Sequence, residues 1–188
     1  MRPSLATERE SQILDALEAC VREVGIGGLT TQLIAEKSGL SRSHIRHYLG
    51  NKADQLKALV MLYTERYASS LERLVDTAES EDRREVVIRE LFGDTWQDLG
   101  QDDDLVLDAL NAYAASSPDA PSLAPMYDRI GEVVARTLHE AGSSPAEART
   151  QAQLMVAFAF GVSSMHRLGL IDQQAALRHA RRLMLLED

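Results

Sequence analysis

The spacing of three residues, Ala35, Gly39 and Ile45, constrains the fold of this chain more than any other feature of its sequence. Ala35 is small enough to let a helix approach a second helix closely, and Gly39 adopts the left-handed conformation of a tight turn without a Cβ clash. Ile45 then falls on the inner face of the second helix. Thr30 and Ser41 are favourable N-caps for the two helices. The segment is therefore predicted to form a helix-turn-helix.

The second helix of such a unit enters the major groove of DNA by its N-terminal end. Arg42, Ser43 and His44 lie in its first turn and are candidates for reading base edges, with Arg42 suited to guanine O6 and N7. The alternative for each is solvated surface. Arg46 is suited to a base or to a phosphate. His44 and His47 have the i, i+3 spacing of a chelating pair, but no third ligand lies nearby in the sequence, so no metal site is predicted.

The stretch from Leu29 to Lys52 resembles the DNA-binding domain of TetR-type one-component transcriptional regulators. It reads LTTQLIAEKSGLS followed by HIRHYLGNK, and its HY with a following Gly-X-Lys is most similar to the BetI-like branch. Two residues depart from the family pattern. Arg46 stands where many relatives carry tyrosine, which affects base or phosphate contacts, and Leu49 stands where most carry phenylalanine, which repacks a small core.

The resemblance implies which side chains meet the phosphate backbone. Thr31, His47, Tyr48 and Lys52 match positions that make such contacts in similar proteins, and these contacts position a protein without reading sequence. Together with the caps and the first turn of the second helix, they give the predicted DNA-binding set: Thr30, Thr31, Ser41, Arg42, Ser43, His44, Arg46, His47, Tyr48 and Lys52.

The net charge of −9 is unusual for a nucleic-acid-binding protein, but it is unevenly distributed. Residues 1–60 carry eight Lys or Arg against seven Asp or Glu, a net of +1, and the remainder carries 12 against 22, a net of −10. Between Ser41 and Lys57 there are four basic residues, two histidines and one acid. A local positive patch is therefore expected in the N-terminal region.

Helical periodicity continues through the rest of the chain, with no alternating β pattern and no internal repeat. The chain is predicted to be all-α, with about nine helices: a three-helix DNA-binding helix-turn-helix domain over residues 1–51 and a helical effector-binding and dimerisation body over residues 52–188. The first helix is expected to end at Gly25, and the fourth to run from Lys52 to about Leu74. Further helices are expected over about 82–99, 103–116, 122–142 and 144–168, with a last one ending near 186.

Small side chains in the last two helices indicate close helix packing, and the final helix has an apolar stripe. The resemblance implies a four-helix bundle formed by this pair of helices in two subunits, so the operator should be an inverted repeat. The alternative is that both helices close a monomer core. The predicted dimer interface comprises Ala157, Gly161, Ser164, Leu177, Ala180 and Met184.

Most aromatic residues lie in the body, and several share helix faces at i, i+4 spacing. With three methionines they could line a cavity for an apolar or cationic small molecule, although ordinary core packing is the alternative for each one. The resemblance implies that such a cavity binds an effector. The predicted effector-binding residues are Tyr63, Tyr67, Phe92, Trp96, Tyr113, Met126, Tyr127, Met155 and Phe158.

Other classes of protein lack support in the sequence. No nucleophile elbow, phosphate loop or metal motif occurs, so neither enzyme activity nor a cofactor is expected. The longest apolar run, from Leu154, is about half the roughly 18 residues that a membrane span needs. The N-terminus lacks the apolar core of a signal peptide, so a cytoplasmic location is expected. The single cysteine, Cys20, excludes a disulfide within the chain and is expected to be a small buried hydrophobe.

The sequence therefore predicts a dimeric, ligand-responsive transcriptional regulator that binds an inverted-repeat operator through residues 41–48. A repressor released by a small-molecule effector is expected. The alternatives are an activating or ligand-independent regulator, or a helical interaction protein with a vestigial DNA-binding head.

Overall fold

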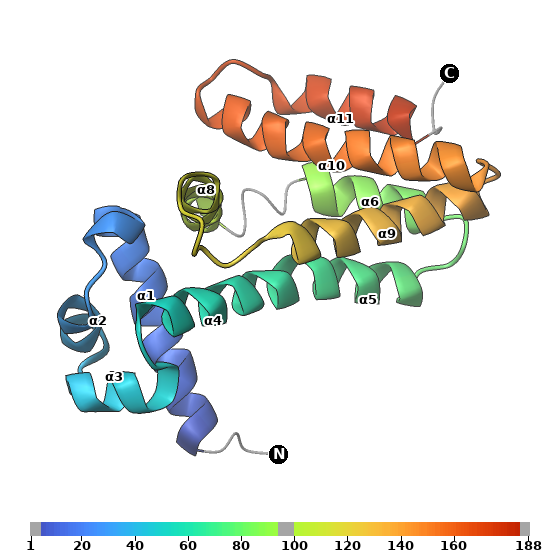
Figure 1. Ribbon diagram of the computed structural model, residues 1–188. Helices are drawn as coiled ribbons and strands as arrows, with labels where there is room; N and C mark the ends of the chain where they lie inside the picture. Colours follow the sequence, from blue (N-terminus) through green and yellow to red (C-terminus); the bar gives the residue numbers. More distant parts are fainter. Residues whose placement is uncertain (1–4, 94–99, 185–188) are drawn as a thin grey trace. The chain divides into compact units, whose positions relative to one another are not determined.

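The structure, a computed structural model, describes residues 5–93 and 100–184, and its regular elements are all helical (Figure 1). This confirms the predicted all-α fold. Helical residues continue from α4 through a π-helical segment, η1, into α5, so the described residues form nine helices. The elements are α1 (Leu5–Gly28), α2 (Thr31–Ser38), α3 (Arg42–Leu49), α4 (Lys52–Thr64), η1 (Glu65–Ser69), α5 (Ser70–Thr77), α6 (Arg83–Phe92), α8 (Gly100–Ser116), α9 (Ala124–Glu140), α10 (Pro145–Arg167) and α11 (Gln173–Leu183).

The helix boundaries agree with the sequence in most places. α1 kinks at Gly25, where φ is 65°, and the predicted end of the first helix lies at this kink. Ser144 and Glu147 form a capping box at the start of α10, and their hydrogen bonds lower the pKa of the Glu147 carboxyl. The helix predicted over 82–99 is α6, which ends at Phe92. Residues 94–99 lie outside the described residues.

The chain forms two compact units. The first contains the described residues of Met1–Thr64 and Asp102–Leu123, and the second contains those of Glu65–Gln101 and Ala124–Asp188. These units are defined by packing contacts. The predicted boundary between residues 51 and 52 separates a DNA-binding domain from an effector-binding and dimerisation body, and it stays a prediction.

The core of the first unit is formed where α1 packs against α2, α3 and α4. Ile13 and Leu17 of α1, Ile34 of α2, Ile45 of α3 and Leu59 of α4 are all fully buried. Full burial of one such aliphatic side chain contributes about 1.5 to 3 kcal/mol. One apolar residue from each short helix therefore fixes that helix against α1.

Cys20 belongs to the same core and is fully buried, as expected from its spacing on α1. Burial is the main cause that raises the pKa of its thiol. The thiol is therefore held in its protonated, unreactive form.

A buried polar contact joins α1 to the end of α4. The Tyr63 hydroxyl donates to Glu18 Oε1 over 2.8 Å, and both residues are buried. Buried polar groups require hydrogen-bond partners, because an unmade bond costs the desolvation of the group. This bond therefore makes the position of α1 depend on that of α4.

The π-helical segment η1 begins the second unit. Just before it, the Thr64 hydroxyl donates to the Val60 carbonyl over 2.8 Å, a side-chain bond that competes with regular helix geometry. Within and after it, the side chains of Ser69 and Arg73 donate to Glu65, and these bonds lower the pKa of the Glu65 carboxyl. Short π segments that interrupt α-helices are frequent at functional sites.

In the second unit, α9 packs against both α5 and α10 (Figure 1). Two ion pairs tie α9 to α5, between Arg129 and Glu72 and between Arg136 and Asp76, each with an N–O distance of 2.6 Å. The four side chains are 42 to 52 % exposed. Such pairs contribute little to stability, so their main effect is geometric.

The last helix, α11, packs against α6 and α10. Ala180 and Met184 are fully buried there, and Arg84 of α6 donates to the Met184 carbonyl over 3.2 Å.

None of the described helices combines the length and the apolar character that crossing a bilayer requires.

Candidate nucleic-acid interface

The predicted helix-turn-helix is present as α2, a short turn and α3. Thr30 caps α2 by accepting from the Leu33 amide, and Ser41 caps α3 by accepting from the His44 amide. Gly39 forms the turn with φ 68° and ψ 16°, and its amide donates to the Ala35 carbonyl. The left-handed conformation predicted for Gly39 is therefore confirmed, and it sets the angle between the two helices.

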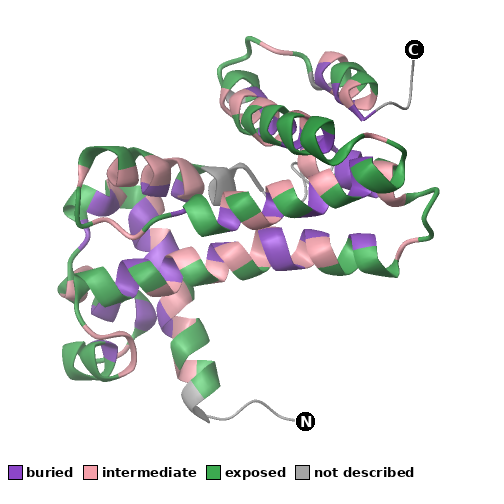
Figure 2. Ribbon diagram, turned by 45° about the vertical axis from the view of Figure 1, so that its right-hand side comes forward, coloured by how far each residue is buried: buried purple, intermediate pink, exposed green. Residues whose placement is uncertain are grey.

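α3 is largely exposed (Figure 2). Ile45 is its only buried residue and anchors the helix to the first unit, whereas Tyr48 is half-buried. The five polar side chains Arg42, Ser43, His44, Arg46 and His47 are all exposed. The side chains predicted to reach DNA thus lie on the solvent-facing surface of this unit.

Hydrogen bonds link the residues at the N-terminus of α3. Ser41 Oγ lies 2.8 Å from Ser43 Oγ and 3.2 Å from His44 Nδ1, and it also accepts from the His44 amide at 3.3 Å. The cap of α3 therefore also orients two side chains of its first turn. At the other end, the rings of His47 and Tyr48 meet edge to face with centroids 5.1 Å apart.

A hollow of about 530 Å³ adjoins the end of α3 and the start of α4. Thr31, Arg46 and Lys52 line it, together with Gly50, Asn51 and Asp54. Arg46 is predicted to contact either a base or a phosphate. The hollow brings it together with Thr31 and Lys52, which are both predicted to contact phosphate. This arrangement favours a phosphate contact for Arg46.

The Lys52 ammonium is engaged within the protein. Its Nζ donates to the Ile26 carbonyl over 2.7 Å and so links the start of α4 to the end of α1. An ammonium group has three donors. The contact with Ile26 uses one of them, and the predicted phosphate contact stays a prediction.

Two glutamines hold this surface in place, and the sequence did not reveal either of them. Gln55, which is buried on α4, donates to the Gly50 carbonyl over 3.1 Å at the end of α3. Gln12 of α1 donates to the Ser38 carbonyl over 2.7 Å at the end of α2. The one available signal is that Gln55 interrupts the apolar stripe of α4 beside Leu56.

The predicted effector residues fall in different environments. Tyr63 belongs to the buried contact with Glu18 in the first unit, and Tyr113 is half-buried in that unit, whereas Tyr67 is half-buried in the second. Trp96 lies outside the described residues. In the second unit the rings of Phe92 and Phe158 are 5.3 Å apart. Met126 and Met155 are buried there as well, and Tyr127 contacts Phe160 with ring centroids 6.1 Å apart.

The predicted dimer-interface residues also divide into groups. Ala157 is exposed on α10, and Gly161, Ser164 and Leu177 are half-buried. Ala180 and Met184 are covered within the chain itself.

Across the described residues, no group of three or more His, Cys, Asp or Glu side chains is arranged to hold a metal ion.

Residues 13–59 match the model of a family described as "Bacterial regulatory proteins, tetR family". This span contains the helix-turn-helix, so the N-terminal domain is of the TetR type. A sequence comparison with curated proteins gives no match.

The whole chain is similar in fold to solved structures of regulators. A TetR transcription regulator from Haloarcula marismortui is 19 % identical with a TM-score of 0.77, and the alignment covers 95 % of each chain. A TetR-like transcriptional regulator from Rhodococcus sp. RHA1 is 24 % identical with a TM-score of 0.72, covering 98 % of this chain and 97 % of the other. A Saccharomonospora viridis protein solved in complex with choline is 17 % identical with a TM-score of 0.77, covering 95 % and 96 %.

Proposed function

We propose that this chain is a dimeric TetR-type transcriptional regulator, a repressor, that binds an inverted-repeat operator through α3 and acts in the cytoplasm. The observation that carries the proposal is the exposed first turn of α3, anchored by one buried residue, Ile45, within a domain of the TetR type. Affinity at the level of an operator requires more contacts than one short helix makes, which favours a two-fold dimer.

Arg42 is proposed to read a guanine, and its substitution tests the function. Arg42→Ala should weaken operator binding by about 10- to 100-fold and relax the preference at one base pair. Arg42→Lys should lose a similar factor, because an ammonium group keeps the charge but not the bidentate geometry. The measurement is an electrophoretic mobility shift with DNA from upstream of the gene that encodes this chain, and circular dichroism checks the fold.

Lys52→Ala supplies the matched control for a phosphate interaction. It should weaken binding to all DNA sequences alike and lower the slope of log affinity against log salt by about one, because one phosphate is no longer neutralised. If the wild-type chain gives no salt-sensitive, sequence-specific complex, the regulator proposal is wrong and the interaction-protein alternative is favoured.

We also propose that a small-molecule effector binds the second unit and releases the operator. The support is the contact between the rings of Phe92 and Phe158, with Met155 buried three residues from Phe158 on α10 and Met126 buried on α9. The HY and Gly-X-Lys residues of the N-terminal domain are similar to the BetI-like branch, and the Saccharomonospora viridis protein was solved in complex with choline. Quaternary ammonium compounds are therefore the first class of effector to test. An effector with a tenfold preference for the released conformer should weaken operator binding by up to the same factor.

A further inference from the structure

We propose that Ser41 decides which hydrogen-bonding groups the first turn of α3 offers to DNA. Its hydroxyl donates to Nδ1 of His44 and accepts from Ser43, so His44 presents an Nε2–H donor and Ser43 presents an acceptor. This inference rests on the proposed function, because it concerns the same surface. It gives Ser41 a positioning role in addition to its role as the N-cap of α3.

The Ser41 hydroxyl has three polar neighbours. It accepts from the His44 amide at 3.3 Å, and its Oγ lies 2.8 Å from Ser43 Oγ and 3.2 Å from His44 Nδ1. A hydroxyl has one hydrogen and two lone pairs. Because the amide takes one lone pair, the hydroxyl must donate to one of the other two neighbours and accept from the remaining one.

Only two arrangements satisfy this condition, and they have opposite polarity. If Ser41 donates to Nδ1 and accepts from Ser43, the single hydrogen of the neutral imidazole is on Nε2, and Ser43 has only lone pairs left to offer. If Ser41 instead donates to Ser43 and accepts from Nδ1–H, Nε2 is bare and the Ser43 hydrogen is free. His44 and Ser43 therefore present opposite groups in both arrangements.

The position of the ring at a helix N-terminus favours the first arrangement. The amides of the first turn give this end of a helix a partial positive charge. Nδ1 of His44 faces Ser41 Oγ, which itself accepts from one of these amides. The charge attracts a lone pair on Nδ1 and repels an N–H group. Ser43 and His44 are both exposed, so their remaining groups are accessible to a ligand.

This arrangement limits the base edges that each side chain can read. In the major groove, purine N7, guanine O6 and thymine O4 are acceptors, whereas the amino groups of adenine and cytosine are donors. His44 should therefore contact an acceptor, and Ser43 should contact an amino group. The second arrangement would exchange these two preferences.

Substitution of Ser41 tests the assignment. Aspartate is as favourable an N-cap as serine, but its carboxylate only accepts hydrogen bonds. Ser41→Asp should therefore move the His44 hydrogen from Nε2 to Nδ1. Ser41→Thr keeps the hydroxyl and is the matched control, so Nδ1 should stay bare. Nitrogen-15 NMR of the full chain measures this at about pH 9, where an unperturbed histidine is neutral, and His44→Gln identifies the signal.

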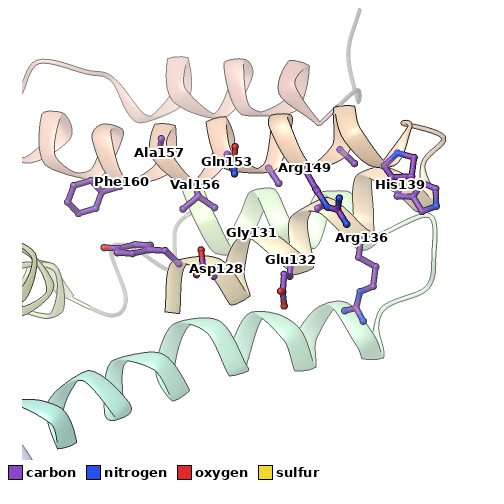
Figure 3. Close-up of a pocket in the computed structure, with 15 residues that line it drawn as sticks. Asp128, Gly131, Glu132, Arg136, His139, Arg149, Gln153, Val156, Ala157 and Phe160 are labelled. Carbon is purple, nitrogen blue, oxygen red and sulfur yellow. The ribbon is translucent and has the colours of Figure 1, made fainter. Parts of the chain in front are cut away.

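Two other histidines supply internal references for the same spectra. Nδ1 of His139, which lines the hollow between α9 and α10, lies 2.9 Å from the Ser143 carbonyl (Figure 3). Nδ1 of His166 lies 3.1 Å from the Ile171 carbonyl. A carbonyl only accepts, so both rings should carry their hydrogen on Nδ1. His44 of the wild-type chain should differ from both.

Operator DNA with altered bases tests the reading itself. Footprinting on DNA from upstream of the gene locates the bound bases, which are then replaced singly by analogues that lack one acceptor: 7-deazapurines, 2-aminopurine for guanine and 5-methyl-2-pyrimidinone for thymine. At one position the analogue should weaken binding of the wild-type chain and of Ser41→Thr by about 3- to 10-fold, the loss of one hydrogen bond. It should cost Ser41→Asp no further affinity. Comparing each variant with itself removes the repulsion between the new carboxylate and phosphates.

The inference is overturned if Nδ1 of His44 is mostly protonated in the wild-type chain, a result that needs no variant. It is also overturned if Ser41→Asp, shown to be folded by circular dichroism, leaves Nδ1 bare, or if every analogue costs the wild-type chain and Ser41→Asp equally. If the wild-type chain forms no sequence-specific complex, the regulator proposal fails, and the NMR result still decides whether Ser41 sets the hydrogen position of His44.

Discussion

Gly39 and Gly50 both have positive φ values at the ends of short helices, but they should respond differently to alanine. At Gly39, with φ 68° and ψ 16°, an added Cβ meets nothing within 4 Å. Only the left-handed backbone opposes the change, at about 1 to 2 kcal/mol. Reduced freedom of the unfolded chain offsets about 0.4 to 1 kcal/mol of this. Gly39→Ala should therefore cost about 1 kcal/mol.

At Gly50, with φ 66° and ψ −143°, the backbone lies near a region that is essentially restricted to glycine and costs about 1 to 3 kcal/mol for other residues. An added Cβ would also lie 2.5 Å from Asp54 Oδ2, which accepts from the Asn51 amide at 3.1 Å. Displacing that carboxylate loses a hydrogen bond of about 1 kcal/mol. With the same offset of about 0.4 to 1 kcal/mol from the unfolded chain, Gly50→Ala should cost about 2.5 kcal/mol in all.

Native-state hydrogen exchange of the amides in α2 and α3 measures this difference locally. A gap of about 1.5 kcal/mol corresponds to roughly tenfold faster exchange in Gly50→Ala than in Gly39→Ala. Gly27→Ala is the matched control, because its Cβ meets nothing and its φ lies outside the positive range. Equal losses at both sites, or a larger loss at Gly39, would refute the reasoning.

Two other predictions concern the first unit. Tyr63→Phe should lower the free energy of unfolding of this unit by about 1 to 3 kcal/mol in urea titrations, because Glu18 loses a buried donor. Adding Glu18→Met should recover part of this loss. A Tyr63→Phe variant as stable as the wild-type chain would contradict the prediction. Cys20 is fully buried and the pKa of its thiol is raised, so at pH 8 it should react with a disulfide reagent only as fast as the unit opens. In denaturant it should react at once. Rapid labelling of the native chain would show that the core is open.

The helix-turn-helix was predictable because it depends on short-range spacing. Caps, a turn glycine and one inward aliphatic residue lie within about four turns of helix, so their sequence positions determine their geometry. The same holds for the helix expected from about residue 144, because its start depends on the local capping box at Ser144.

Contacts between distant segments were not predictable in this way. Gln55 supports the end of α3 only because the carbonyl of Gly50 faces it, and the sequence of α4 does not record that. The apolar stripe of α11 was visible in the sequence. Periodicity shows which face of a helix is apolar, but it does not show whether that face is covered by the same chain or by a second subunit. The sequence therefore could not show that Ala180 and Met184 are enclosed by their own chain.

The two ion pairs between α5 and α9 have a mechanical consequence. Their partners are seven residues apart on α9, at Arg129 and Arg136, and four apart on α5, at Glu72 and Asp76. Because Glu72 and Asp76 are one turn apart, sliding one helix past the other by a single turn breaks both pairs and leaves only one new pair, Arg129 with Asp76 or Arg136 with Glu72. Both ion pairs are therefore made in one register only, and they favour that register over its neighbours by no more than the small free energy of one exposed pair.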